Sequence, residues 1–222
     1  MISIEALYKR VGDLSRKTQN GHLTPEQFSR DVQSVQRIML EYYYSVYGGP
    51  QSSIDSLYPF IKEVSINVFS TGHFDLPGDY RFFIDGVYSS TVKEECGQYT
   101  TSDCQVRFET DEVIRANQKT TTRRYGNGRH CLRAVNGRVE IVGARYGSVK
   151  LSYIRTPDNP VYAVTYTNGS IKPVFDAENS VDLEWNDKDF ENFVDALLVY
   201  KGIETREGQL AQFVMNKKSI IG

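Results

Sequence analysis

Apolar side chains recur with a helical period at both ends of the chain and with a period near two in its middle. Near the N-terminus, the apolar positions three or four residues apart are Ile4, Leu7, Tyr8, Val11 and Leu14. A second apolar stripe runs from Phe28 to Val46, and Thr24-Pro25 before it suits a capping residue followed by a first helical turn. Since Gly48-Gly49-Pro50 blocks its continuation, we expect a helical hairpin over residues 1–49.

Short runs of β-branched and aromatic residues, separated by turn residues, dominate the middle of the chain. The clearest runs are residues 81–84, 132–135, 139–142, 149–154 and 162–166. Asp85-Gly86 is expected to close the first run, and Asn136-Gly137 and Asn168-Gly169 favour tight hairpin turns because both central positions of such turns need positive φ. The pattern predicts a β-rich middle lobe over residues 50–180.

The helical period returns near the C-terminus. Apolar residues form a stripe from Phe190 to Leu198, with Asn186 or Asp187 as the cap and Gly202 as the stop. Thr205 can cap a final helix that passes through Val214. Residues 181–222 are therefore expected to form C-terminal helices that pack with the N-terminal hairpin.

Helices and strands are segregated along the chain, which favours an α+β fold over a parallel α/β fold. We expect the N- and C-terminal helices to form a bundle beside a small antiparallel β-sheet lobe. The 222-residue chain is 40% hydrophobic and 24% charged, a composition typical of folded proteins. No apolar run approaches the ~20 residues of a membrane span, so no membrane association is expected.

Charge is balanced overall, at a formal −2, but it is unevenly distributed along the chain. Residues 107–155 contain eleven basic and four acidic residues, a net of +7, whereas residues 175–207 contain three basic and ten acidic residues, a net of −7. Opposite charges on one chain suit contacts between copies, although two solvated faces would have the same composition. The candidate basic patch, facing either a neighbouring subunit or DNA, is Arg123, Arg124 and Arg129. The candidate complementary acidic patch is Asp182, Glu184 and Asp187.

We find no catalytic residues, metal site or cofactor site in the sequence, and we expect the chain not to be an enzyme. Cys96, Cys104 and Cys131 lack zinc-site spacing, and the EF-hand-like stretch around Gly21 lacks the calcium-binding carboxylates. Two alternatives stay open. The acids of residues 176–195 could serve a carboxylate-based hydrolase, and Arg123, Arg124 and Arg129 could serve a sequence-independent DNA-binding protein.

Three stretches resemble, in order, a family of head-to-tail connector proteins from short-tailed, crAss-like bacteriophages. The first is residues 20–28, followed by a glutamine-rich helix and Glu41-Tyr42-Tyr43. The second is the strand of residues 149–156 followed by the doubled-proline turn Pro157-Asp158-Asn159-Pro160. The third is residues 180–185, followed by the helix of residues 190–203.

The resemblance implies a structural protein of the virion, assembled in the host cytoplasm. Members of this family are ring or adaptor subunits that stack on the portal, join head to tail and line the DNA exit channel. The implied partners are identical copies in a dodecameric ring, the portal protein above it and a further ring or tail protein below it. Non-specific contact with genomic DNA is also implied.

Overall fold

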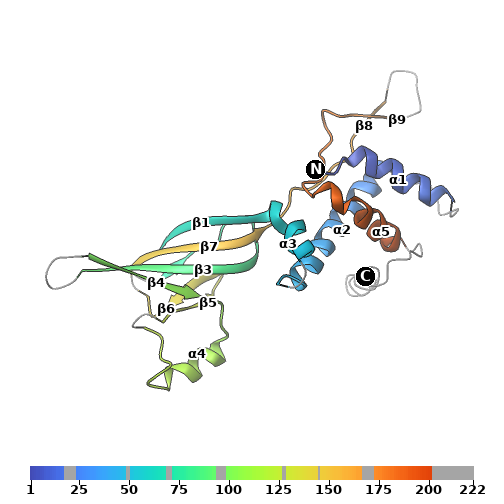
Figure 1. Cartoon of the computed structure of the whole chain (residues 1–222). Helices are drawn as coiled ribbons and strands as arrows, with labels where there is room; N and C mark the ends of the chain where they lie inside the picture. The colour runs from blue at the N-terminus through green and yellow to red at the C-terminus, as the bar shows by residue number, and fades with distance from the viewer. Residues whose placement is uncertain are drawn as a thin grey trace. The chain divides into compact units, whose positions relative to one another are not determined.

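The chain forms two compact units, made of residues 1–59 with 157–222 and of residues 60–156. The computed structural model (Figure 1) describes residues 1–17, 24–48, 51–68, 72–93, 99–126, 129–144, 146–166 and 173–201. The units therefore divide at Pro59 and Pro157, whereas the sequence pattern predicts a middle lobe over residues 50–180. The reason is local: residues 157–162 are bound by helix α2 of the first unit, as described below.

The first unit is mainly helical. Its elements are α1 (Ile4–Lys17), α2 (Pro25–Ser45), α3 (Gln51–Leu57), a short hairpin of β8 (Val164–Tyr166) and β9 (Pro173–Phe175), a 3-10 turn η2 (Asp187–Asp189) and α5 (Phe190–Tyr200). A further 3-10 turn, η1 (Tyr58–Phe60), leads into the second unit. Thr24 caps α2 by accepting from the backbone N–H of Gln27 at 3.3 Å, as its sequence predicts.

Helices from the two ends of the chain pack against one another in this unit, since α5 contacts both α1 and α2. Most residues of the apolar stripes predicted for these helices are buried, including Leu7, Val32 and Leu197, each with no exposed surface. The partly exposed members are Tyr8, Leu14, Tyr42, Val46 and Phe190. Trp185, also fully buried, packs against Tyr43 of α2 and Phe193 of α5. Large side chains of this kind each contribute about 1.5–3 kcal/mol or more when buried, so the contact between the chain ends is a main source of stability.

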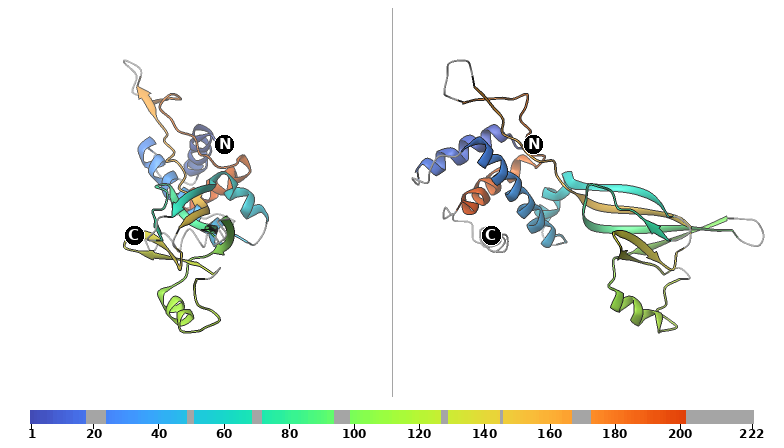
Figure 2. Two further views of the ribbon diagram at one scale, coloured as in Figure 1. Left: turned by 90° about the vertical axis from the view of Figure 1, so that its left-hand side faces the viewer. Right: turned by 180° about the vertical axis from the view of Figure 1, so that it is seen from behind.

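The second unit is a pair of antiparallel sheets. One sheet has the order β1-β7-β3-β4, formed by β1 (Ile61–Val68), β7 (Gly147–Arg155), β3 (Tyr80–Lys93) and β4 (Tyr99–Val106). The other has the order β2-β6-β5, formed by β2 (His73–Phe74), β6 (Arg138–Val142) and β5 (Cys131–Val135). Helix α4 (Asp111–Gln118) lies on the side of β5 and β6, as Figures 1 and 2 show.

One apolar core joins the two sheets. Its buried residues come from every strand of the unit and include Val68, Phe74, Tyr88, Leu132 and Leu151. Both inner faces contribute side chains to this cluster, so the burial of apolar surface holds the two sheets together. Strand β5, which follows the segment between α4 and β5, is part of this core through Leu132.

The mixed α+β class with antiparallel sheets is confirmed by the structure. The predicted turn at Asn136-Gly137 is also confirmed: it joins β5 to β6, and its residues have φ of 49° and 77°. The turns and helix expected at Asn168-Gly169, Gly202 and Thr205 lie outside the described residues.

Asp85-Gly86 does not close a strand, contrary to the sequence prediction. Strand β3 continues through it to Lys93, with register irregularities near Phe83 and Asp85. A Cβ atom on Gly86 would lie 3.0 Å from Cγ2 of Val106, so the glycine allows β3 and β4 to approach closely. Helices α3 and α4 were not predicted either, because each is too short to show a full apolar stripe.

Candidate functional site

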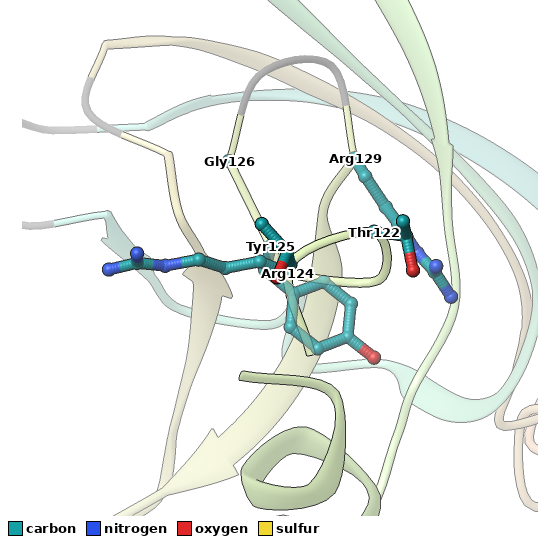
Figure 3. Close-up of a pocket in the computed structure, with 6 residues that line it drawn as sticks. Thr122, Arg124, Tyr125, Gly126 and Arg129 are labelled. Carbon is teal, nitrogen blue, oxygen red and sulfur yellow. The ribbon is translucent and has the colours of Figure 1, made fainter. Parts of the chain in front are cut away.

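A basic hollow lies in the segment that connects α4 to β5. Its volume is about 530 Å³, and most of the residues that line it are exposed. Figure 3 draws these residues as sticks. The lining residues are Thr121, Thr122, Arg124, Tyr125, Gly126 and Arg129. The hollow thus contains two of the three arginines that the sequence analysis selected, and Arg123 is exposed next to them.

Helix α4 is anchored on the β unit through a small apolar cluster. Ile114 is its one buried residue, and it packs with Tyr125, Cys131 and Val142. Asp111 and Glu112 occupy the first turn of α4, where negative charge is favourable to the helix dipole. The cluster fixes both ends of the connecting segment, because Ile114 precedes it and Cys131 follows it.

Tyr125 is the central residue of the hollow, and it is only 8% exposed. Its hydroxyl donates to the carboxylate of Glu109 and accepts from Nδ2 of Asn117 at 2.8 Å. Burial, together with the hydrogen bond to Glu109, raises the pKa of Tyr125 to about 12. The phenol is therefore neutral at physiological pH and adds no negative charge to the hollow.

Arg129 is positioned by Tyr125 and by the backbone. Its guanidinium lies over the Tyr125 ring, 5.5 Å from the ring centroid, a favourable cation–π distance. The backbone nitrogen of Gly126 donates to the Arg129 carbonyl at 2.8 Å, and the Arg129 nitrogen donates back at 3.2 Å. Gly143 makes room for this bridge, since a Cβ atom there would lie 2.7 Å from the Gly126 nitrogen.

Five exposed cations gather along α4 and the connecting segment. They are Arg115, Lys119, Arg123, Arg124 and Arg129. None of them forms an ion pair with a carboxylate of the described residues, whereas nearby Arg133 pairs with both Glu140 and Asp111. These five residues are called the basic face below.

Each of the three candidate acidic residues has an intramolecular partner. Asp182 Oδ1 accepts from the backbone nitrogen of Ile4 at 2.8 Å, at the start of α1. Glu184 Oε2 accepts from the backbone nitrogen of Asp158 at 2.9 Å, and Asp187 Oδ1 lies 3.2 Å from the amino group of Met1. The three carboxylates thus bind three different groups in the helical unit, and their role as a complementary patch stays a prediction.

Among the described residues, no group of three or more His, Cys, Asp or Glu side chains is placed to hold a metal ion. Cys104 and Cys131 are free thiols, and burial raises the pKa of Cys131 to about 11. Cys96 and the EF-hand-like residues around Gly21 lie outside the described part of the chain. No helix that the structure describes is both long enough and apolar enough to span a membrane.

Two sets of polar residues escaped the sequence analysis. Glu109 and Asn117 lie 16 and 8 positions from Tyr125, and nothing in their local pattern indicates this pairing. Asp189 is 2% exposed, and its Oδ1 accepts from the hydroxyls of Ser56 at 2.8 Å and Tyr43 at 3.2 Å. For the first set, the sequence holds one signal of a site, which is the tyrosine within the basic run of residues 123–129.

The sequence matches no model of a known protein family and no curated protein.

Proposed function

We propose that the chain is a structural protein of a phage virion, a ring or adaptor subunit that stacks on the portal and joins head to tail. Its partners would be identical copies in a dodecameric ring, the portal protein, and a further ring or tail protein. In this proposal the helices form a bundle flanking the β lobe, and the subunit carries out no chemical reaction. It acts through contacts with its neighbours.

The observation that carries the proposal is that the three stretches resembling the connector family are hydrogen-bonded to one another. Gln36 Nε2 of the glutamine-rich helix donates to the Asp158 carbonyl at 2.9 Å, and Gln33 Nε2 donates to the Pro160 carbonyl at 3.2 Å. The Asp158 nitrogen in turn donates to Glu184. The doubled-proline turn cannot complete a strand ladder, so the glutamines and Glu184 supply its partners.

The hairpin of β8 and β9 offers a surface for contact with a neighbouring copy. Figures 1 and 2 show it reaching away from α1, α2 and α5, and Tyr166 and Val174 on it are 65% and 51% exposed. These two strands form a sheet of their own, which pairs with no other strand of the described chain. Isolated two-stranded hairpins are marginally stable in water, so packing against a second copy would stabilise this one.

Side-chain contacts connect this hairpin to the core of the helical unit. Phe175 stacks on Tyr162 with ring centroids 5.2 Å apart, and Tyr162 stacks on Tyr8 of α1 at 4.2 Å. The base of the hairpin is therefore held rigidly, while the exposed residues lie beyond it. This is the arrangement that a preorganised contact between subunits requires.

Electron microscopy of the purified chain mixed with the portal protein of the same phage tests the proposal. We expect closed rings of the chain seated on the portal. The double variant Tyr166→Ser/Val174→Ser should form fewer rings, whereas Tyr146→Ser/Val113→Ser, which changes an exposed tyrosine and valine of the β unit, should form rings like the unmodified chain. Persistent monomers that do not bind the portal would overturn the proposal.

A further inference from the structure

We propose that the basic face binds the phosphate backbone of duplex DNA without reading its sequence. The inference rests on the proposed ring function, which places the subunit beside the viral genome, and it adds the residues that make the contact. DNA is favoured over the other candidate partner of these residues, an acidic surface of a second copy.

The cations of the basic face are available for a ligand. Two exposed lysines elsewhere in the β unit are held by carboxylates: Lys62 pairs with Asp79 at 2.8 Å and Lys150 with Glu63 at 2.7 Å. The basic face has no such pairs within the described chain. Binding phosphates there breaks no ion pair, and the release of counterions from the DNA favours association.

Acidic residues near the basic face are bound to other groups. Glu109 accepts from the Tyr125 hydroxyl, and Asp111 lies 3.6 Å from Arg133. Tyr125 itself stays neutral because its pKa is raised. Glu109 keeps its negative charge, because the hydroxyl that donates to it is neutral. Glu109 and Glu112 are then the two acids of residues 109–129 that no cation of the described chain pairs, and five cations outweigh them.

The geometry fits a linear polyanion better than a small anion. Figure 3 shows the side chains of Arg124 and Arg129 extending to opposite sides of Tyr125, so their guanidinium groups do not converge on one point. Charges spread over a surface match phosphates spaced along a strand. Thr121 and Thr122 in the same hollow add hydroxyl donors of the kind that position phosphates.

The acidic surface of a second copy is the less favoured partner. Asp182 already accepts from the start of α1, Glu184 from the doubled-proline turn, and Asp187 lies against the Met1 amino group. A neighbouring basic face would have to compete with these contacts. Phosphates in DNA have no such internal partners.

Fluorescence anisotropy with a labelled duplex of mixed sequence, measured over a series of salt concentrations on the full chain without portal, tests the inference. The unmodified chain should bind, with an affinity that falls steeply as salt rises. The triple variant Arg123→Gln/Arg124→Gln/Arg129→Gln should bind about tenfold more weakly or worse, and its logarithmic salt slope should fall by about 0.9 for each phosphate that the variant no longer neutralises.

Two control variants keep the result interpretable. Lys9→Gln/Arg30→Gln/Arg37→Gln removes the same number of exposed charges from the helical unit and should leave the affinity and slope nearly unchanged. Arg123→Lys/Arg124→Lys/Arg129→Lys keeps the charge and should retain most of the slope. Equal far-ultraviolet circular dichroism of all variants shows that each is folded.

The inference is overturned if the unmodified chain does not bind the duplex, or if the glutamine variant binds with the same affinity and slope. It is also overturned if the glutamine substitutions only reduce self-association of the chain, which would assign the basic face to a second copy. Rings that form on the portal despite any of these results would preserve the ring proposal. DNA binding without ring formation would preserve the basic face and overturn the ring.

Discussion

Asp182 and Ile4 are joined by a hydrogen bond of 2.8 Å between Oδ1 and the backbone nitrogen, across 178 positions of sequence. The carboxylate satisfies one of the backbone donors that the first turn of a helix leaves without a partner, and its charge favours the positive end of the α1 dipole. Next to it, Ile2 and Leu183 exchange backbone hydrogen bonds of 3.1 Å in both directions. One short segment thus fixes the N-terminal helix onto the C-terminal part of the chain.

Replacing Asp182 by alanine should lower the free energy of unfolding by about 1–2 kcal/mol, because an acceptor at the start of α1 is removed. Urea unfolding followed by circular dichroism measures this change. The matched control is Asp187→Ala, whose side chain is 82% exposed and should cost less than about 0.5 kcal/mol. Equal losses for the two variants would contradict the assignment of Asp182 to the helix start.

Replacing Asp189 by alanine should destabilise the helical unit more strongly, by about 3 kcal/mol, because two buried hydroxyls lose their acceptor. Tyr43 also accepts from Asn192 at 2.9 Å, and both burial and Asp189 raise its pKa above the ordinary tyrosine value. In a Tyr43→Phe background, the cost of Asp189→Ala should be smaller, since one of the two hydroxyls is already absent. Additive costs in a double-mutant cycle would show that the two groups do not interact.

Asp79 should make the stability of the β unit depend on pH. Its carboxylate accepts from Lys62 at 2.8 Å and from Tyr153 at 2.7 Å, and the Lys62 hydrogen bond is the main cause that lowers its pKa. A lowered folded-state pKa gives stability that is present above the unfolded value of about 3.9 and is lost as pH falls through the folded value. The difference in unfolding free energy between the unmodified chain and Asp79→Asn should therefore be full at neutral pH and shrink in acid.

The control for this measurement is Asp75→Asn, which removes a carboxylate that is 71% exposed and pairs with Arg138. We expect little change at any pH, because exposed pairs contribute weakly. A difference for Asp79→Asn that stays constant from neutral pH into acid would refute the role assigned to the Lys62 hydrogen bond.

Cys131 should react slowly with alkylating reagents. It is 1% exposed, and burial is the main cause that raises its thiol pKa to about 11, so little thiolate is present at neutral or mildly alkaline pH. Iodoacetamide labelling followed by peptide mass spectrometry should modify Cys104, which is partly exposed, before Cys131. Labelling in denaturant provides the control, since both thiols should then react at similar rates; similar rates in the folded chain would contradict the buried position.

Local patterns in the sequence predict much of the secondary structure and little of the site. Thr24 and Asn136-Gly137 are predictable because capping and tight turns depend on neighbouring residues alone. Gly86 was misread as a turn because its role is to make room for Val106, 20 positions away. A close approach between strands leaves no trace in the sequence around either residue.

The arginines of the basic face are visible in the sequence as a charged run, but the sequence does not show whether they are free to bind a ligand. Their availability depends on two contacts that only the fold brings about: Glu109 accepts from Tyr125, and Asp111 pairs with Arg133. In the same way, the sequence does not show that two of the candidate acids, Asp182 and Glu184, accept hydrogen bonds from backbone nitrogens. Long-range hydrogen bonds decide which charges of this chain remain available.

The central claim is that this chain works by assembling with copies of itself. Native mass spectrometry of the purified chain in the presence of its portal protein tests that claim most directly. The account predicts a closed species whose mass is a whole-number multiple of 25.3 kDa, dodecameric if the family resemblance holds, in addition to the portal. A chain that stays at the mass of one copy at every concentration, with and without portal, would contradict it.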